Sequence, residues 1–312
     1  MGKPSSRNLD RESCRPAVFV ASSATHTIDE VVARVEAELA ARSVGNPREE
    51  AREIVAALLD LPRHLVVPHT SAPMDLLLLA RALRAARCRA LGMPFQYAVG
   101  RASFRHLTLE LDERVLIPRP ETELLVDLVL DATRHNPGGT AIDVGTGSGA
   151  IAIALAQEGT FERVVATDVS LDALVVARFN AASLAPSLRA RVEIRHGSLL
   201  GPALDIRARA VVSNPPYIAF EEAGALPASV RDWEPSVALF SAGNGLAVTA
   251  GLVHEAAGHL EPGGVLALEV DARRASLVAE MVLADTRYAD VSVRLDLAGR
   301  ERFVVARRRE ER

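Results

Sequence analysis

The sequence predicts an α/β protein in which a small helical domain precedes a mostly parallel, doubly wound sheet. Three observations lead to this class. Between residues 140 and 270, short apolar runs alternate with helical stretches, as in parallel sheets covered by helices on both faces. Before residue 92, apolar residues recur with helical spacing. The last two strand-like runs have no helix between them, so we expect them to form an antiparallel edge hairpin.

The helical domain is expected over residues 27–91, after a flexible tail over residues 1–26 that is rich in Ser, Arg and Thr. Thr27 is a candidate N-cap, and Glu30 three positions later completes a capping box. Asn46 is the candidate cap of the second helix, because a proline at the first helical position follows it. The expected helices cover residues 27–41, 46–60 and 72–91.

A linker is expected over residues 92–123, and within it "LTLELDERVLI", residues 107–117, has the character of a β-hairpin. The sheet domain is then expected over residues 124–308. Its strands are predicted at residues 140–145, 163–168, 191–196, 209–214, 264–270, 289–295 and 302–308.

Composition excludes several kinds of chemistry. Lys3 is the only lysine of the 312 residues, which excludes a Schiff-base or phosphate-loop lysine in the sheet domain. The net charge of -4 carries no global signature of nucleic-acid binding. Cys14 and Cys88 lack metal-ligand spacing, so no metal site is expected. No apolar run reaches the length of a membrane span, and we expect a cytoplasmic protein without a membrane partner.

A glycine-rich loop, "DVGTGSG", lies where the first predicted strand of the sheet turns into an Ala-rich helix. Gly145, Gly147 and Gly149 allow a tight turn and a close approach of the backbone to a ligand. The next strand ends at Asp168, 23 positions after Gly145, where a carboxylate can accept hydrogen bonds from two ribose hydroxyls. The pattern predicts a cofactor that contains a nucleoside.

Two cofactors fit this arrangement, and a tight turn without a ligand is the structural alternative. Dinucleotide sites prefer G-x-G-x-x-G, with a pyrophosphate at the helix N-terminus. Here the spacing is G-x-G-x-G with Asp143 just ahead. This arrangement resembles motif one of the class I S-adenosylmethionine-dependent methyltransferases, and the resemblance favours S-adenosyl-L-methionine over a dinucleotide. The helix start would face the methionine carboxylate of that cofactor, and Asp143 would meet its ammonium group.

The segment "SNPPYI" follows the fourth predicted strand of the sheet, so it ends at the same edge as the glycine loop. Asn-Pro by itself is ordinary turn chemistry. At this edge, however, the side-chain oxygen of Asn214 and the carbonyl of Pro215 are two acceptors on a stiff turn completed by Pro216, and Tyr217 adds a flat apolar face. Two acceptors fixed on the N–H bonds of a planar nitrogen would orient its lone pair for methylation and stabilise the developing positive charge.

Several motifs together resemble the bacterial protein-(glutamine-N5) methyltransferases that modify class 1 peptide-chain release factors. They are "GMPFQY", "ERVLIPRPETE", "DVGTGSGAIAIALA", "SNPPYI" and "VRDWEPSVALFSAGNGL", and the resemblance covers about residues 28–307. It implies the seven-stranded, Rossmann-like sheet of class I S-adenosylmethionine-dependent methyltransferases, with a helical domain that binds the substrate. It also implies a release factor as the protein partner, modified at the glutamine of a Gly-Gly-Gln loop.

The resemblance assigns roles by position. Cofactor binding is implied for Asp143, Gly145, Thr146, Gly147, Ser148, Gly149, Asp168, Ser198, Leu199 and Asn214. Binding of the substrate amide is implied for Asn214, Pro215, Pro216 and Tyr217. Residues 118–123 should cover the site, although Glu121 and Glu123 equally fit ordinary placement of acidic residues at a helix N-terminus.

Some positions depart from the family pattern: Ser198, Asn244, Val270, Asp271 and Arg274. The substrate therefore stays open between a release factor, a ribosomal or other protein, and a small amide. An N6-adenine DNA methyltransferase would share the "NPPY" turn, but the chain carries no added Lys/Arg-rich recognition domain, and no stable nucleic-acid binding is expected. A binding protein that kept the fold and lost the chemistry is the non-enzymatic alternative.

Overall fold

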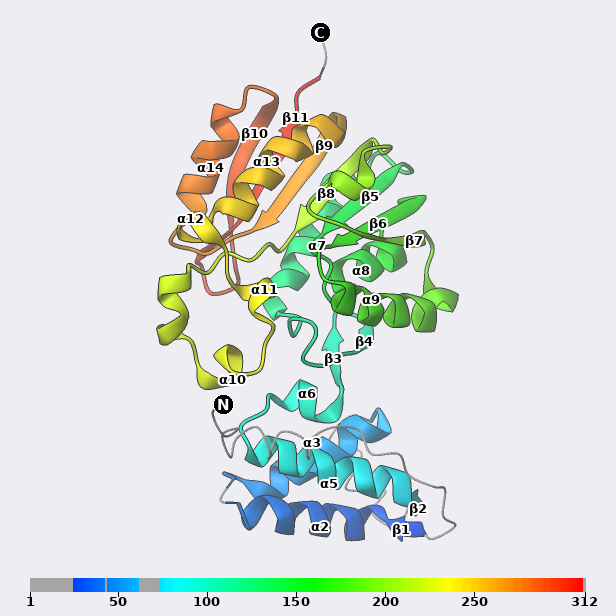
Figure 1. Cartoon of the computed structure of the whole chain (residues 1–312). Helices are drawn as coiled ribbons and strands as arrows, with labels where there is room; N and C mark the ends of the chain where they lie inside the picture. The colour runs from blue at the N-terminus through cyan, green and yellow to red at the C-terminus, as the bar shows by residue number, and fades with distance from the viewer. Residues whose placement is uncertain (1–24, 43, 62–72, 311–312) are drawn as a thin grey trace. The chain divides into compact units, whose positions relative to one another are not determined.

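The computed structural model describes residues 25–42, 44–61 and 73–310 (Figure 1). The chain forms two compact units, and each is described by itself. Residues up to 101 and the short segment 228–233 belong to the first unit, and the remainder belongs to the second. The tail expected over residues 1–26 lies outside the described residues except for Thr25 and His26.

The first unit is mainly helical. Val31, Val35 and Leu39 from the first of its helices and Ile54 from the second are completely buried, as their helical spacing requires. Its elements are β1 (Thr25–Thr27), α2 (Ile28–Ala40), α3 (Pro47–Leu59), β2 (Pro73–Asp75), α5 (Leu76–Ala90) and α6 (Phe95–Val99), with β1 and β2 paired antiparallel. That strand pair was not predicted from the sequence.

The two predicted caps differ in outcome. The capping box at Thr27 is confirmed, because its hydroxyl accepts from the Glu30 amide at 3.2 Å and the Glu30 carboxylate accepts from the Thr27 amide at 3.1 Å. Asn46 does precede Pro47 at the helix start, but its side chain makes no capping hydrogen bond. Its backbone is left-handed, with φ of 51°, whereas a residue that caps through its side chain is typically extended.

The second unit, all described up to residue 310, is built on one seven-stranded sheet in the order β10-β11-β9-β8-β5-β6-β7. The five strands β9, β8, β5, β6 and β7 are parallel, and β10 and β11 form the antiparallel edge hairpin. The predicted fold class and all seven predicted strands are confirmed. Their bounds are β5 (Thr140–Val144), β6 (Arg163–Asp168), β7 (Arg191–His196), β8 (Ala208–Ser213), β9 (Leu260–Glu269), β10 (Tyr288–Leu295) and β11 (Glu301–Arg308).

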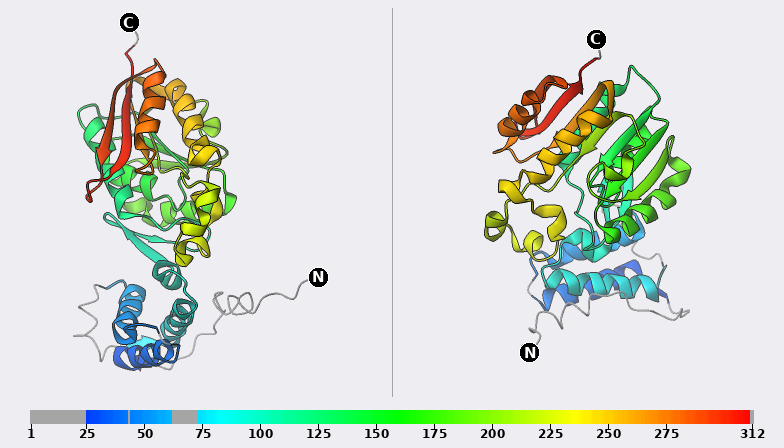
Figure 2. Two further views of the ribbon diagram at one scale, coloured as in Figure 1. Left: turned by 90° about the vertical axis from the view of Figure 1, so that its left-hand side faces the viewer. Right: turned by 45° about the horizontal axis from the view of Figure 1, so that its top comes forward.

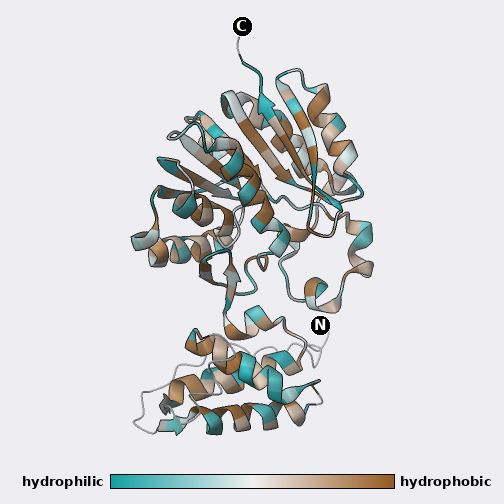
Figure 3. Ribbon diagram, turned by 180° about the vertical axis from the view of Figure 1, so that it is seen from behind, coloured by the Kyte–Doolittle hydropathy of each residue, from teal (hydrophilic) through white to brown (hydrophobic). Residues whose placement is uncertain are grey.

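Helices cover both faces of this sheet (Figure 2). One face is covered by α7 (Pro120–Thr133), α8 (Ala150–Glu158) and α9 (Leu171–Leu184), the other by α13 (Ala247–His259) and α14 (Ala275–Ala284). Because both faces are buried, the central strands are almost entirely apolar (Figure 3). Two shorter helices of this unit, α11 (Ser236–Leu239) and α12 (Ala242–Gly245), precede α13, and α10 (Ala228–Arg231), between β8 and α11 in the chain, belongs to the first unit.

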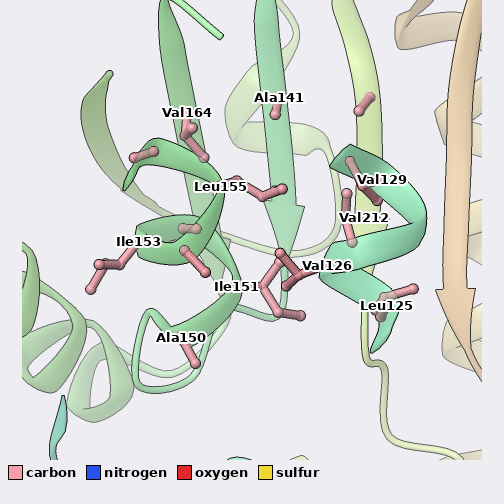
Figure 4. Packing of buried hydrophobic residues seen from close by; sticks show 14 of the residues in the cluster. Leu125, Val126, Val129, Ala141, Ala150, Ile151, Ile153, Leu155, Val164 and Val212 are labelled. Carbon is pink, nitrogen blue, oxygen red and sulfur yellow. The ribbon is translucent and has the colours of Figure 1, made fainter. Parts of the chain in front are cut away.

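Close packing holds the strand ends of the sheet in place. Ile151 and Leu155 of α8 and Val126 of α7 pack with Ala141 of β5 and Val212 of β8 (Figure 4). All of these side chains are 5 % exposed or less. The loops that leave β5, β6 and β8 at their carboxyl ends therefore start from a rigid edge.

The predicted hairpin is present but displaced. It consists of β3 (Arg101–Phe104) and β4 (Leu107–Glu110), and it turns at Arg105, whose φ is 53°. Residues 111–117, which the sequence suggested as its second half, contain no strand. The Asp112 carboxylate accepts from both the backbone and the guanidinium of Arg114, and this local turn ends the extended run.

No helix within the described residues combines the length and apolar character that crossing a membrane requires.

Candidate active site

The glycine loop connects β5 to α8 with three left-handed glycines, at φ of 73° for Gly145, 55° for Gly147 and 88° for Gly149. A Cβ added at Gly145 or Gly147 would meet no protein atom within 4 Å, whereas at Gly149 it would lie 3.0 Å from Ile153. Gly149 therefore serves packing, and the first two glycines leave open space above the loop. The amides of Gly145 and Thr146 both donate to the Thr167 carbonyl, which ties the loop to β6.

Asp143 lies one residue before the end of β5 and is completely buried. Its Oδ2 accepts from the Thr146 hydroxyl at 2.6 Å and from the Ala152 amide at 3.0 Å. Its Oδ1 has no hydrogen-bond partner among the described residues. Burial raises the pKa of Asp143 to about 7. One carboxylate oxygen thus holds the loop against the start of α8, and the other is left unpaired.

Asp168 ends β6 and is half-buried. Its Oδ2 accepts from the Gly147 amide at 2.9 Å, and its Oδ1 accepts from the Ser170 amide at 2.8 Å. These bonds fix the carboxylate beside the glycine loop. Each carboxylate oxygen accepts up to two hydrogen bonds, so both retain capacity for hydroxyl donors.

Three more predicted cofactor residues differ in exposure. Leu199 adopts φ of 48°, and its carbonyl accepts from the Thr167 hydroxyl at 2.9 Å, which places this turn beside β6. Ser198 before it is exposed. Ser148 is only 3 % exposed, and its carbonyl accepts from Asn180. The side chain of Ser148 is thus part of the protein interior.

The asparagine turn, residues 214–217, leaves β8 beside the glycine loop. In the sheet register Ser213 is the partner of Val144, and the Ser213 hydroxyl donates to the Val144 carbonyl at 2.6 Å. The two turns therefore start from neighbouring strands. The sequence predicted that they share this edge of the sheet but not that their strands are paired. Asn214 is half-buried and Pro215 is buried.

Two residues that the sequence did not single out hold the Asn214 side chain. Its Nδ2 donates to the hydroxyl of Thr122 at 3.1 Å, and that hydroxyl donates to the carboxylate of Glu269 at 2.7 Å. Thr122 is 5 % exposed and Glu269 is 1 % exposed. Burial raises the pKa of Glu269 to about 7. A carboxylate at the end of a parallel strand was the available signal in the sequence.

Tyr217 completes the turn. Burial, with the charge of Glu269 second, raises the pKa of its phenol to about 12, so the ring stays neutral at ordinary pH. The following residue, Ile218, exchanges backbone hydrogen bonds with Leu239 and Ser241, which fixes the chain beyond the turn. A Cβ at Gly245 would lie 2.2 Å from the Tyr217 carbonyl oxygen, so Gly245 packs directly against the turn.

The segment over residues 118–123 is anchored by charge. Arg119 forms an ion pair of 2.6 Å with Glu234, a carboxylate only 6 % exposed. Glu123 accepts from the Arg105 amide at 3.0 Å, and Glu121 lies 3.4 Å from Arg300. Both glutamates lie in the first turn of α7 and make structural contacts there.

Comparison with known proteins identifies the family. Residues 30–100 match the PrmC N-terminal domain, and residues 120–226 match the methyltransferase small domain. A release factor glutamine methyltransferase of Moorella thermoacetica is 38% identical over 91% of this chain and 100% of its own length. One from Mycolicibacterium smegmatis is 38% identical over 87% of this chain and 94% of its own length.

The chain belongs to the release factor glutamine methyltransferases. It is accordingly a methyltransferase enzyme, and the family predicted from the sequence motifs is confirmed.

Solved structures show the same fold for this methyltransferase. A methyltransferase from Pyrococcus furiosus has a TM-score of 0.51 at 19% identity and covers 67% of this chain and 92% of its own. The catalytic domain of hMettl16, in complex with a MAT2A 3'UTR hairpin, has a TM-score of 0.55 at 18% identity and covers 73% of this chain and 81% of its own. At this level of identity the similarity concerns the fold.

Three of the positions that depart from the family pattern lie together in the methyltransferase. Arg274 donates from Nε to the Asn244 carbonyl at 2.7 Å, and its Nη1 lies 3.6 Å from Asp271. Its Nη2 donates to both carboxylate oxygens of Glu222, each at 3.0 Å. Asn244 itself is left-handed, with φ of 55°. These departures therefore form one cluster of contacts next to Gly245, while Ser198 lies elsewhere.

No group of three or more His, Cys, Asp or Glu side chains within the described residues is arranged to hold a metal ion.

Proposed function

We propose that this enzyme transfers the methyl group of S-adenosyl-L-methionine to the side-chain amide nitrogen of a protein glutamine, the Gly-Gly-Gln glutamine of a class 1 release factor. One observation carries the proposal. Asn214 directly follows β8, next to β5, the strand that leads into the glycine loop. The Asn214 amide is fixed there by a hydrogen bond to Thr122. The names of the relatives support the choice of a release factor as substrate.

The residues around the glycine loop fit this cofactor. Side chains at Gly145 and Gly147 would enter open space, which the cofactor would fill. The unpaired Oδ1 of Asp143 suits an ammonium group, and Asp168 retains acceptor positions for ribose hydroxyls. The residues proposed to hold the cofactor are Asp143, Gly145, Thr146, Gly147, Ser148, Gly149, Asp168, Ser198, Leu199 and Asn214, with Ser148 acting through its backbone. When bound, the cofactor supplies an electrophilic methyl group on a sulfonium.

The asparagine turn would orient the substrate amide. Asn214 Oδ1 and the Pro215 carbonyl each accept one N–H bond of the glutamine side chain, so the nitrogen lone pair is directed toward the methyl donor. The same two acceptors stabilise the positive charge that develops on that nitrogen. Tyr217 provides a neutral, flat surface for the planar amide, since its phenol does not ionise at ordinary pH.

No base has to act before the methyl group is transferred. The amide nitrogen becomes acidic only as it gains positive charge, so the proton leaves afterwards to water. The described active-site residues are thus assigned to binding, orientation and charge stabilisation. The reaction is proposed to take place in the cytoplasm, with no stable nucleic-acid partner.

The experiment is mass spectrometry of a bacterial class 1 release factor incubated with the full-length chain and S-adenosyl-L-methionine. We expect a mass gain of one methyl group on the peptide that contains Gly-Gly-Gln, with fragmentation placing it on the glutamine side chain. A release factor in which that glutamine is replaced by alanine is the control and should gain nothing. Labelling of ribosomal protein or DNA, with an unmodified release factor, would refute the proposed substrate.

A further inference from the structure

The side chains of Asn214, Thr122 and Glu269 form a chain of two hydrogen bonds in the second unit. Asn214 follows β8, Thr122 lies in the first turn of α7, and Glu269 is the last residue of β9. The donor–acceptor distances are 3.1 Å and 2.7 Å. Thr122 and Glu269 are nearly inaccessible to solvent, so water does not compete for these bonds.

The chemistry of these groups fixes the donor and the acceptor in each of the two hydrogen bonds. When the Glu269 carboxylate is ionised it only accepts hydrogen bonds, so the single hydroxyl proton of Thr122 then points at Glu269. The hydroxyl oxygen then offers only lone pairs to Asn214, and these require the amide nitrogen as the donor. Asn214 Nδ2 is therefore turned toward Thr122, and Oδ1 on the other branch of the amide is turned away from it.

We propose that Thr122 and Glu269 are positioning residues that fix the orientation of the Asn214 amide, so that its oxygen and not its nitrogen is presented to the substrate. The inference rests on the proposed function, in which Asn214 Oδ1 accepts a hydrogen bond from the glutamine amide.

The orientation of the Asn214 amide determines whether it attracts or repels the amide of the substrate. An asparagine amide rotated by half a turn would direct its own N–H groups at the N–H groups of the substrate. Two donors facing each other cannot bond, and their partial charges repel. Without a directional partner an asparagine side chain can adopt either orientation. Thr122 and Glu269 exclude the second orientation before the substrate binds.

The test compares three variants of the full-length enzyme. Thr122→Val keeps the shape of the side chain and removes the hydroxyl, so kcat should fall about five- to tenfold with KM within about twofold of wild type. Thr122→Ser retains the hydroxyl and should restore most of the lost rate.

Thr133→Val is the matched control. Thr133 is also a buried threonine of α7, 3 % exposed, but its hydroxyl donates to the Val129 carbonyl of its own helix at 2.8 Å. Loss of that hydroxyl should leave kcat unchanged. A general effect of removing a buried hydroxyl from α7 would lower kcat in both valine variants.

A second measurement does not depend on activity. In protein labelled with ¹⁵N-asparagine, the Nδ2 protons of Asn214 should exchange slowly with solvent in wild type and in Thr122→Ser, and at least tenfold faster in Thr122→Val. Asn180 is an internal reference, because its buried side chain bonds to Glu110 and Ser148 and does not contact Thr122.

The outcomes separate the two proposals. If wild-type enzyme does not methylate glutamine, the proposed function fails, and the exchange of the Asn214 amide still decides its orientation. A Thr122→Val variant with wild-type kcat, or with unchanged Asn214 exchange, would overturn the positioning role. A lowered kcat together with faster exchange, both reversed in Thr122→Ser, supports it.

Discussion

The two sides of the proposed active site, the glycine loop and the asparagine turn, are stabilised in different ways. The side-chain hydrogen bonds of the glycine loop join residues 3, 9, 21 and 32 positions apart, all between β5 and α9. The asparagine turn depends on Thr122, 92 positions away, which in turn bonds to Glu269, a further 147 positions along the chain. The cofactor side is thus a local structure, whereas the acceptor side requires the complete fold.

This difference has a consequence for dynamics. A local loop keeps its geometry whenever its own strand and helix are formed, but the asparagine turn loses support when α7, β9 or the segment around Gly245 moves. Substitutions near the turn should therefore act on turnover, and substitutions in the loop should act on cofactor affinity.

Asn214→Ala should have the largest effect. It removes one preorganised acceptor from the developing positive charge, which corresponds to a loss of about 10² to 10³ in kcat. The affinity for S-adenosyl-L-methionine, measured by calorimetry, should fall much less than kcat, because Asn214 is only one of the residues proposed to hold the cofactor and the glycine loop does not depend on this side chain for its shape. Turnover within about threefold of wild type would contradict the assigned role.

Gly245→Ala should lower kcat by more than about tenfold and the free energy of unfolding by about 1 to 3 kcal/mol. The added Cβ would lie 2.2 Å from the Tyr217 carbonyl oxygen, and φ is +83°, so the turn must move. Gly258→Ala is the matched control, since a Cβ there meets nothing within 4 Å in α13. Steady-state kinetics and thermal unfolding of both variants measure the contrast.

Gly147→Ala should act on the other side of the site. At φ of 55° an alanine is strained by about 1 to 2 kcal/mol, but its Cβ meets no protein atom within 4 Å. The methyl would instead enter the space proposed for the cofactor, so Kd should rise about tenfold while kcat at saturation changes little. If kcat fell and Kd did not, the separation of the two sides would be wrong.

The pH profile of kcat should fall about fivefold as pH decreases through about 7. Burial raises the pKa of Glu269 to about 7, so the carboxylate is ionised above that pH and only accepts from the Thr122 hydroxyl. Below that pH the protonated carboxyl can itself donate to the Thr122 oxygen, and the orientation of the Asn214 amide is no longer fixed. Arg302 of β11 and Arg119 lower this pKa and Glu121 raises it, while Tyr217 faces the same carboxylate from the turn. In Glu269→Gln the step near pH 7 should be absent. Because Asp143 has a pKa of about 7 as well, a step that persists in Glu269→Gln would assign the titration to Asp143.

The sequence predicted the sheet because its strands are buried on both faces and read as apolar runs, such as residues 208–213. It also predicted the glycine loop and Asp168, whose contacts are local. It did not predict the β1–β2 pair or the position of the hairpin. Those depend on pairing between distant segments and on the left-handed turn at Arg105.

Within the site, the sequence predicted Asn214 and missed the residues that hold it. Thr122 lies inside the motif "ERVLIPRPETE", where the adjacent glutamates are the stronger candidates from sequence because carboxylates are commoner catalytic groups than threonine. Glu269 is the last residue of a strand, a position that many polar residues occupy, so the sequence did not distinguish it as part of the site. Only the packing of α7 against the ends of β8 and β9 brings the three side chains together.

The direct pairing of β5 with β8 has a further consequence. Adjacent strands in a sheet are about 4.8 Å apart, and the register that joins Val144 to Ser213 is fixed by backbone hydrogen bonds. The backbone ladder therefore sets the distance between the starting points of the glycine loop and the asparagine turn, independently of the side chains around them.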